Sequence, residues 1–285
     1  MLSRVLSGLA LLAGTAWAAI SIAPRVMIIS MFEPEGQVWM DRFHESGLGN
    51  ITAQSIPVRG LSMLFPEVQC LANGTICQLT VGEGEINAAA STMAFLLSEK
   101  FDLRNTYFLL GGIGGVNPRH ATLGSVAFSK YAIQVALQYE LDSRSVPNGW
   151  PTGYIPYGRK KPFEYPTITY GTEVFELNEK LRDLAYKYAL KGKMQDATGP
   201  REYRAKYVPL GIMYKQATQP PSVLKCDTAT SEVYYSGRLL SESFENTTRI
   251  WTNGTGVYCM SAQEDNAVLE GLIRGAIEGL VDFSR

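Results

Sequence analysis

The first half of the chain alternates short apolar runs with a segment of helical periodicity. Residues 26–32 and 76–81 are β-rich apolar runs bounded by turn residues, and both patterns predict buried strands. Apolar residues then recur at helical spacing: Ile86, Ala90, Met93 and Leu97. Because residues 87–100 also lack Gly and Pro, we expect a helix packed on a sheet. Residues 107–110 form the next predicted strand, which leads into a glycine cluster.

The second half continues the alternation. A strand or hairpin is predicted over 124–137, and the Pro-, Gly- and Tyr-rich residues 143–172 indicate a long surface excursion. The remaining pattern predicts helices over 174–190, 239–245 and 266–280, and strands over 222–228 and 257–261. Strands alternating with helices favour an α/β fold, a three-layer α/β/α sandwich with a mixed, largely parallel sheet. Ligands of such sheets bind beyond the carboxyl ends of the strands.

Composition narrows the class of protein. The 285 residues carry 26 Lys and Arg against 27 Asp and Glu, and the basic residues are scattered along the chain. A surface that binds nucleic acid by neutralising phosphates is therefore not expected. The 46% hydrophobic content supports a sizeable core and excludes a disordered chain, and no repeat indicates a solenoid or propeller.

The N-terminus has the pattern of a targeting segment. Arg4 precedes an apolar run that ends at Ala16-Trp17-Ala18, a small-x-small pattern accepted by signal peptidases. Residues 1–18 are predicted to be a cleaved secretory signal peptide, which leaves 19–285 as one α/β domain of a secreted or cell-surface protein. The alternative is an uncleaved anchor, because no charge occurs between Arg4 and Arg25. No later window is apolar enough to predict a membrane-spanning helix.

Four N-x-Ser/Thr sequons agree with that compartment. They begin at Asn50, Asn73, Asn246 and Asn253. One sequon alone arises by chance, whereas four in a secreted chain predict a glycosylated surface.

The four cysteines predict disulfides. Their even number allows three pairings in an oxidising compartment, of which we favour Cys70 with Cys77 and Cys226 with Cys259. The first would close a short turn, and the second would join two predicted strands that flank a helix. A zinc site is the alternative, but no C-x-x-C occurs and neither histidine lies near a cysteine in sequence, so no metal is expected.

The glycine cluster is a candidate binding element. Gly111, Gly112, Gly114 and Gly115 follow a predicted strand, so the backbone could turn sharply and present N–H groups to an anion or a sugar hydroxyl. The spacing differs from the dinucleotide motif G-x-G-x-x-G, and no Lys-Ser/Thr follows as in a Walker loop. A purely structural turn is the alternative.

Several stretches carry a resemblance to a known family. They are GEINAAASTMAF, GGVNP, LGSVAF, YGTEVFE, CDTAT, YYSG and QEDNA, and together they span nearly the whole chain after the signal. The block from Thr80 to Lys130 resembles the centre of the nucleoside phosphorylase and nucleosidase superfamily, and the full set is closer to the purine nucleoside permease family. The resemblance implies a nucleoside phosphorylase-like fold, purine nucleosides such as adenosine and guanosine as partners, and no cofactor. Homo-oligomerisation stays open.

The resemblance also implies site residues. Gln263-Glu264 stands where the superfamily has a Met-Glu pair that binds ribose, so Glu264 is the expected ribose ligand, with the glycine turn as its cradle; a bidentate carboxylate suits a cis-diol. The alternative for Glu264 is an acid favoured by a helix N-terminus. Tyr234 and Tyr235 stand where a base-stacking aromatic is expected, although paired tyrosines also occur in cores.

The first predicted strand supplies the candidate for catalysis. In nucleosidases this strand ends in a Glu that activates water, and SMFEPEG places Glu35, or less favourably Glu33, there. Loop glutamates often have no such role. The same stretch has no Arg of the kind that phosphorylases use for phosphate, which disfavours phosphate as the nucleophile.

The C-terminus is a second departure from the superfamily. The sequence stops at Arg285, before the strand and helix whose Asp would protonate the purine. An exposed sheet edge is therefore expected, with a truncated gene model or a splice form as its source.

Three hypotheses follow: a purine nucleoside-binding protein that serves uptake, a purine nucleosidase or phosphorylase that cleaves the N-glycosidic bond, and a non-catalytic storage or surface glycoprotein.

Overall fold

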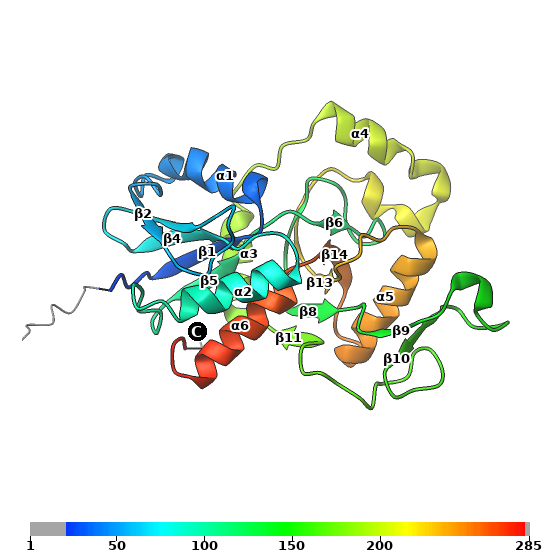
Figure 1. Ribbon diagram of the computed structural model, residues 1–285. Coiled ribbons are helices and arrows are strands. Elements are labelled where there is room, and N and C mark those ends of the chain that lie inside the picture. Colours follow the sequence, from blue (N-terminus) through cyan, green and yellow to red (C-terminus); the bar gives the residue numbers. More distant parts are fainter. Residues whose placement is uncertain (1–20, 283–285) are drawn as a thin grey trace, which may run out of the picture.

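The structure is a computed structural model that describes residues 21–282 (Figure 1). The predicted signal peptide, residues 1–18, lies outside these residues. The described chain is a mixed α/β protein, which confirms the predicted class. Its main hydrogen-bonded strands form two five-stranded sheets, and two further strand pairs lie beside them.

The first sheet places parallel strands at its centre and antiparallel strands at one edge. In spatial order its strands are β2 (Gln54–Pro57), β3 (Glu67–Cys70), β4 (Ile76–Thr80), β1 (Val26–Ser30) and β5 (Tyr107–Leu110). Strand β1 pairs in parallel with β4 and with β5, whereas β2, β3 and β4 pair antiparallel. The carboxyl ends of β4, β1 and β5 therefore meet at one edge.

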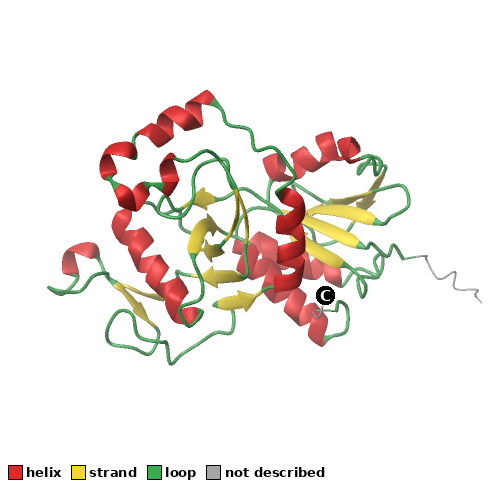
Figure 2. Cartoon of the chain, turned by 180° about the vertical axis from the view of Figure 1, so that it is seen from behind, coloured by secondary structure: helices red, strands yellow, loops and turns green. Residues whose placement is uncertain are grey.

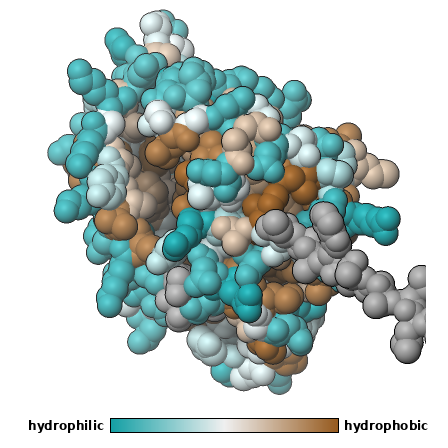
Figure 3. Space-filling model, turned by 90° about the vertical axis from the view of Figure 1, so that its left-hand side faces the viewer, coloured by the Kyte–Doolittle hydropathy of each residue, from teal (hydrophilic) through white to brown (hydrophobic). Residues whose placement is uncertain are grey.

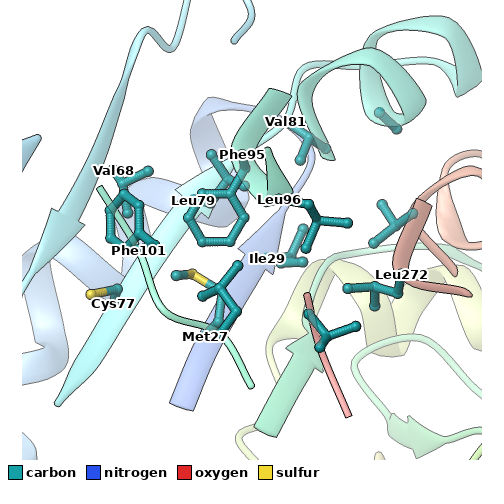
Figure 4. Packing of buried hydrophobic residues seen from close by; sticks show 14 of the residues in the cluster. Met27, Ile29, Val68, Cys77, Leu79, Val81, Phe95, Leu96, Phe101 and Leu272 are labelled. Carbon is teal, nitrogen blue, oxygen red and sulfur yellow. The ribbon is translucent and has the colours of Figure 1, made fainter. Parts of the chain in front are cut away.

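Helices cover both faces of this sheet. Side chains alternate along β4. Leu79 packs with Phe95 of α2 (Glu85–Leu96) in the main apolar cluster (Figure 4). Thr80, on the other face, approaches Gly36 of α1 (Glu33–Arg42). Period-two alternation places successive residues on opposite faces. A Cβ on Gly36 would lie 2.6 Å from Thr80 Oγ1, so only glycine permits this approach. The result is the expected layering of helix, sheet and helix.

Small residues allow α2 to pack closely against α6 (Asp265–Ile277). A Cβ on Gly271 would lie 2.7 Å from Thr92, and one on Gly275 would lie 2.9 Å from Leu96. The two helices therefore lie side by side over the sheet, with Leu272 of α6 in the same apolar cluster (Figures 1 and 4). Large-to-small changes in such a core cost about 2–5 kcal/mol each.

The second sheet packs around its own smaller core. Its strands, in order, are β11 (Val174–Glu176), β8 (Tyr131–Gln134), β13 (Asp227–Thr230), β14 (Tyr258–Ala262) and β6 (Gly115–Val116). Helix α5 (Arg238–Trp251) covers this sheet (Figure 2). It contributes Phe244 to a cluster with Ile133 and Ala229.

The other described elements are short. They are β7 (Val126–Phe128) paired with β12 (Val223–Lys225), β9 (Gln138–Glu140) paired with β10 (Tyr154–Pro156), α3 (Glu179–Ala189), α4 (Thr198–Ala205), and the 3-10 turns Phe43–Ser46, Ser143–Ser145, Val208–Leu210, Ile212–Tyr214 and Gln216–Thr218.

Three sequence-based boundaries are wrong. The single strand predicted over 222–228 is two strands, because β12 pairs with β7 while β13 belongs to the second sheet. Residues 124–137 are not one strand or hairpin, because β7 and β8 belong to different sheets; the chain turns where the Asp227 carboxylate accepts hydrogen bonds from the Lys130 and Tyr131 backbone N–H groups. The helix predicted over 174–190 begins later, because Val174–Glu176 pairs with β8 and Asn178 caps α3 by accepting from Lys180 N and Leu181 N.

Both favoured disulfides are present. Cys70 and Cys77 face each other across the β3–β4 hairpin, with Cα atoms 4.1 Å apart. Cys226, just before β13, bonds to Cys259 on β14, and α5 lies between them in sequence. The four sulfurs are thus in disulfides, which excludes the zinc alternative for them.

Strand β5 is one edge of the first sheet, whereas the absence of a C-terminal strand stays a prediction. Within residues 21–282 β5 pairs only with β1, and Tyr107 and Leu109 are exposed on it. The chain returns to this side through a parallel bridge between Leu103 and Val281.

Figure 3 shows a face on which apolar side chains form patches among polar ones. None of the helices described between residues 21 and 282 has the length and apolarity needed to cross a membrane.

Candidate functional site

Three loops meet beyond the carboxyl ends of the first sheet's parallel strands. Glu35 follows β1, the turn at Gly84 follows β4, and the glycine cluster follows β5. Glu264 reaches the same region from the end of β14, at the N-cap of α6. The fold therefore brings the predicted catalytic and ribose-binding residues to the same edge of the sheet. Ligands of parallel sheets bind at this edge.

Glu35 is held by backbone N–H groups on both carboxylate oxygens. The side chain is 5% exposed; Oε2 accepts from Met31 N at 2.7 Å, and Oε1 accepts from Ile113 N at 2.7 Å. Burial raises the pKa of Glu35, and the nearby charge of Glu83 adds to the rise, while the backbone hydrogen bonds oppose it. Glu35 is therefore a fixed, desolvated carboxyl group with a raised pKa, which suits a general base or acid.

The glycine cluster has a steric role at each of three positions. A Cβ on Gly112 would lie 2.5 Å from Glu35 Oε1, and one on Gly114 would lie 2.2 Å from the backbone oxygen of Ser261. A Cβ on Gly115 would lie 2.3 Å from Ser261 Oγ. Glycine thus permits the turn to contact both Glu35 and β14. This supports the alternative that the glycine cluster is a purely structural turn. The predicted contact of the turn with ribose stays a prediction.

Glu264 is anchored to the turn after β4. It is 6% exposed, and its Oε1 accepts from Gly84 N at 2.8 Å. Burial raises its pKa, the Gly84 hydrogen bond opposes the rise, and the charges of Glu35 and Glu232 add to it. Glu35 follows β1 and Gly84, which binds Glu264, follows β4, so both carboxyl groups lie at the same edge of the first sheet. The neighbouring Asp265 has its pKa raised to about 7 by burial and by the same two glutamates.

Sequence reasoning missed two further carboxylates of this region. Glu232 accepts a hydrogen bond from Glu85 N, and the Glu85 side chain accepts one from Gln134 Nε2. Burial, followed by the charge of Glu232, raises the pKa of Glu85. The only available signal was the run GEGE after a predicted strand. Together with Glu264, these residues place several acids around the N-terminus of α2, where the helix dipole favours negative charge.

The two candidate tyrosines differ in environment. Tyr234 is 85% exposed. Tyr235 packs edge-on against Phe244 with ring centroids 4.5 Å apart, and its hydroxyl donates to Tyr258 Oη at 3.0 Å. Burial raises the pKa of Tyr235. Tyr235 thus has the packing partners of a core residue, and base binding by either tyrosine stays a prediction.

A second polar cluster lies beside α5. Glu245 accepts from Asn117 Nδ2 at 2.9 Å and pairs with Arg119 at 3.1 Å, and His120 Nε2 lies 3.1 Å from it. Burial acts to raise the pKa of Glu245, but the hydrogen bonds from His120 and Asn117 and the charge of Arg119 outweigh it and hold the pKa low. Arg119, Glu245 and Phe163 are among the residues that line a cavity of about 300 Å³.

Another cavity lies next to Glu35. It has a volume of about 400 Å³ and is lined by Glu33, Gly36, Gln37, Met40, Leu64, Phe65 and Thr80. Glu33, the less favoured candidate for water activation, is exposed at this cavity, while Glu35 turns inward to the glycine cluster. The two acids thus have different surroundings, and water activation by either of them stays a prediction.

Fold and site define a mixed α/β protein with buried glutamates gathered at the carboxyl edge of a sheet. The family model described as purine nucleoside permease (NUP) matches residues 23–285, and the chain belongs to this family. A purine nucleoside permease of Candida albicans is 46% identical over 270 residues, covering 92% of this chain and 63% of its own length. A probable purine nucleoside permease of Schizosaccharomyces pombe is 39% identical, covering 92% and 75%. The chain thus spans less than two thirds of the Candida relative.

Solved structures with a similar arrangement are more distant. A futalosine hydrolase mutant of Helicobacter pylori has a TM-score of 0.48 at 12% identity, covering 90% of this chain and 83% of that one. A 5'-methylthioadenosine/S-adenosylhomocysteine nucleosidase of Colwellia psychrerythraea, in complex with adenine, has a TM-score of 0.46 at 13% identity, covering 89% and 77%. At this distance neither activity can be carried over to the present chain.

Proposed function

We propose that this chain binds purine nucleosides outside the cell or at its surface and serves their uptake. Membership of the purine nucleoside permease family supports the proposal. The observation that carries it is geometric: Glu35 is held by Ile113 N after β5, and Glu264 is held by Gly84 N after β4. These two carboxyl groups are more than 200 residues apart in sequence but lie at one edge of the sheet. Oε1 of Glu264 accepts from Gly84 N, and we expect the second carboxylate oxygen to accept from a ribose hydroxyl.

Calorimetric titration of the protein with adenosine and guanosine tests the proposal. We expect saturable binding that weakens in Glu264→Gln, because the amide replaces an acceptor oxygen with a donor. Glu278→Gln is the matched control, since Glu278 is an exposed acid at the end of the same helix. No heat of binding with either nucleoside would refute the proposal and favour the storage or surface glycoprotein.

Cleavage of the N-glycosidic bond is the second candidate function. It is favoured by Glu35, a buried carboxyl that is fixed by two backbone N–H groups and has a raised pKa. Such a group could take a proton from an attacking water. Chromatography of the titrated sample should then show free adenine. Glu35→Gln should abolish release while Glu33→Gln, at the exposed neighbouring acid, retains it; equal loss in both variants would contradict this role.

The secreted location is part of the proposal. The two disulfides support it, because such bonds persist in oxidising compartments. N-terminal sequencing of the chain recovered from the medium of a eukaryotic host should begin at Ala19. Retention of the whole chain in the cytosol would contradict the location without touching nucleoside binding.

A further inference from the structure

The four predicted sequons differ in whether the asparagine lies in an exposed turn or within a helix. We propose that Asn50, Asn73 and Asn253 carry N-linked oligosaccharides, that Asn246 does not, and that the sugars lie away from the candidate site. The inference rests on the secreted location proposed above. It does not depend on whether the protein binds or cleaves nucleosides.

Asn50 and Asn73 have the same exposed turn conformation. Asn50 Oδ1 accepts from Thr52 N at 3.0 Å and from Thr52 Oγ1 at 2.9 Å. Asn73 Oδ1 accepts from Thr75 N at 3.1 Å and from Thr75 Oγ1 at 2.7 Å. These are Asx turns, which bring the hydroxyl and the carboxamide of a sequon together. Both asparagines are exposed, so an attached sugar would extend into solvent without disturbing the fold.

Asn253 occupies the exposed turn between α5 and β14. Its backbone is left-handed, with φ 50°, a conformation that asparagine tolerates better than most residues, and Gly254 follows with φ 82°. The side chain is exposed, and no helix or strand includes it. A sugar on this turn is therefore compatible with the folded chain.

Asn246 lies within α5, where the sequon is not available. Its Nδ2 donates to the Glu242 backbone oxygen at 2.9 Å, and the hydroxyl-bearing Thr248 is 0% exposed. Side chains two positions apart on a helix do not face each other, so Thr248 cannot approach the Asn246 carboxamide there. A sugar would also have to leave from the wall of the cavity beside Arg119. Folding of α5 thus competes with modification at Asn246.

Strand direction places the three exposed sequons away from the carboxylates. Asn73 precedes β4 and Asn253 precedes β14, whereas Gly84 follows β4 and Glu264 follows β14. Asn50 precedes β2, which two antiparallel pairings orient like β4. Each exposed sequon therefore lies at the end of a strand opposite to the candidate site. Sugars there would hydrate the outer end of the molecule and leave the carboxylates accessible.

The modification needs a co-substrate of known chemical class, an oligosaccharide carried on a lipid diphosphate. Asparagine Nδ2 attacks the anomeric carbon of the sugar, the bond from that carbon to the diphosphate oxygen breaks, and the lipid diphosphate leaves with the electron pair. The amide nitrogen loses one proton to a base of the transferase. A new N–C bond forms, and no oxidant or reductant is consumed.

The test is expression of the full chain in a eukaryotic host, followed by enzymatic sugar release in heavy-oxygen water and peptide mass spectrometry. We expect the Asn-to-Asp label at Asn50, Asn73 and Asn253 and none at Asn246. Asn246→Gln should therefore leave the gel mobility of the secreted chain unchanged, whereas Thr255→Val should remove one oligosaccharide. Label at Asn246, or an unlabelled Asn50, Asn73 or Asn253, would overturn the assignment.

Two further readouts separate this inference from the proposed function. A secreted chain with no sugar overturns the inference alone, whereas a chain that stays in the cytosol without sugar overturns the location as well. Thr52→Ser is the conservative control: it keeps the hydroxyl of the Asx turn, so Asn50 should retain its oligosaccharide. Enzymatic removal of the sugars should leave the affinity for adenosine unchanged if the protein binds it, and a large change in affinity would refute their placement away from the site.

Discussion

Replacing Gly112 by alanine should displace the Glu35 side chain without adding or removing a titratable group. The added Cβ would lie 2.5 Å from Glu35 Oε1 and 2.8 Å from its carboxyl carbon. Gly112 has no positive φ, so alanine fits the backbone and the clash is purely local. The carboxylate must retreat by about 1 Å, which breaks its 2.7 Å bond from Ile113 N. Losing a hydrogen bond to a charged group costs about 1.5–3 kcal/mol.

Adenosine affinity measures this effect. If the displaced carboxylate also loses one charged hydrogen bond to the ligand, about 1.5–3 kcal/mol, the affinity should be roughly 10- to 150-fold weaker. Gly111→Ala is the matched control, because its Cβ would meet only ordinary contacts, the nearest at 3.7 Å on Trp39. Thermal unfolding of both variants separates local displacement from loss of fold. Equal affinities for the protein, Gly112→Ala and Gly111→Ala would refute the reasoning that the turn positions Glu35 for the ligand.

Three other predictions concern charge and covalent structure. Burial raises the pKa of Glu264 above 4.5, so protonation of this group stabilises the folded state. Between pH 4.5 and that raised pKa, the free energy of unfolding should fall with increasing pH, while adenosine affinity should rise. Glu264→Gln should flatten both titrations, and unchanged slopes would contradict this. Alanine at both Cys226 and Cys259, which lie 33 residues apart, should lower the free energy of unfolding by about 3.7 kcal/mol in a urea titration, against about 2.4 kcal/mol for the hairpin disulfide. The reverse order would argue against the chain-entropy account. Arg119→Met leaves Glu245 without its guanidinium partner and should lower the free energy of unfolding by about 3 kcal/mol at neutral pH. This loss of stability should shrink as the pH falls below 4.5 through the lowered pKa of Glu245. A pH-independent loss would indicate that Arg119 acts through packing instead.

Boundaries that sequence patterns missed depend on partners far along the chain. The stretch 124–137 is apolar enough to predict one strand, yet the Asp227 carboxylate, about 100 residues later, binds the backbone at Lys130 and Tyr131 and directs β8 into the second sheet. Residues Val174–Glu176 form a strand only because β8 offers an edge. Local periodicity carries no information about such partners.

The candidate site shows the same division. Glu35 and Glu264 were recognised from motifs, and GEGE marked a turn, but nothing in the sequence indicated that Glu232 would accept from Glu85 N. That contact joins two loops more than 140 residues apart, and its effect on the pKa of Glu85 depends on burial. Burial and proximity are properties of the folded chain.

The sequence by itself determined the α/β class, the order of the main strands and helices, the two disulfides and the family, because these follow from local periodicity, cysteine context and motifs. The tertiary structure alone decided that Glu35 turns inward, that Gly112 must lack a Cβ, and that the sequon at Asn246 is closed within a helix. The physical reason is that hydrophobic patterning specifies which face of each element is buried. Only the packing of those faces specifies which polar groups meet, and at what distance.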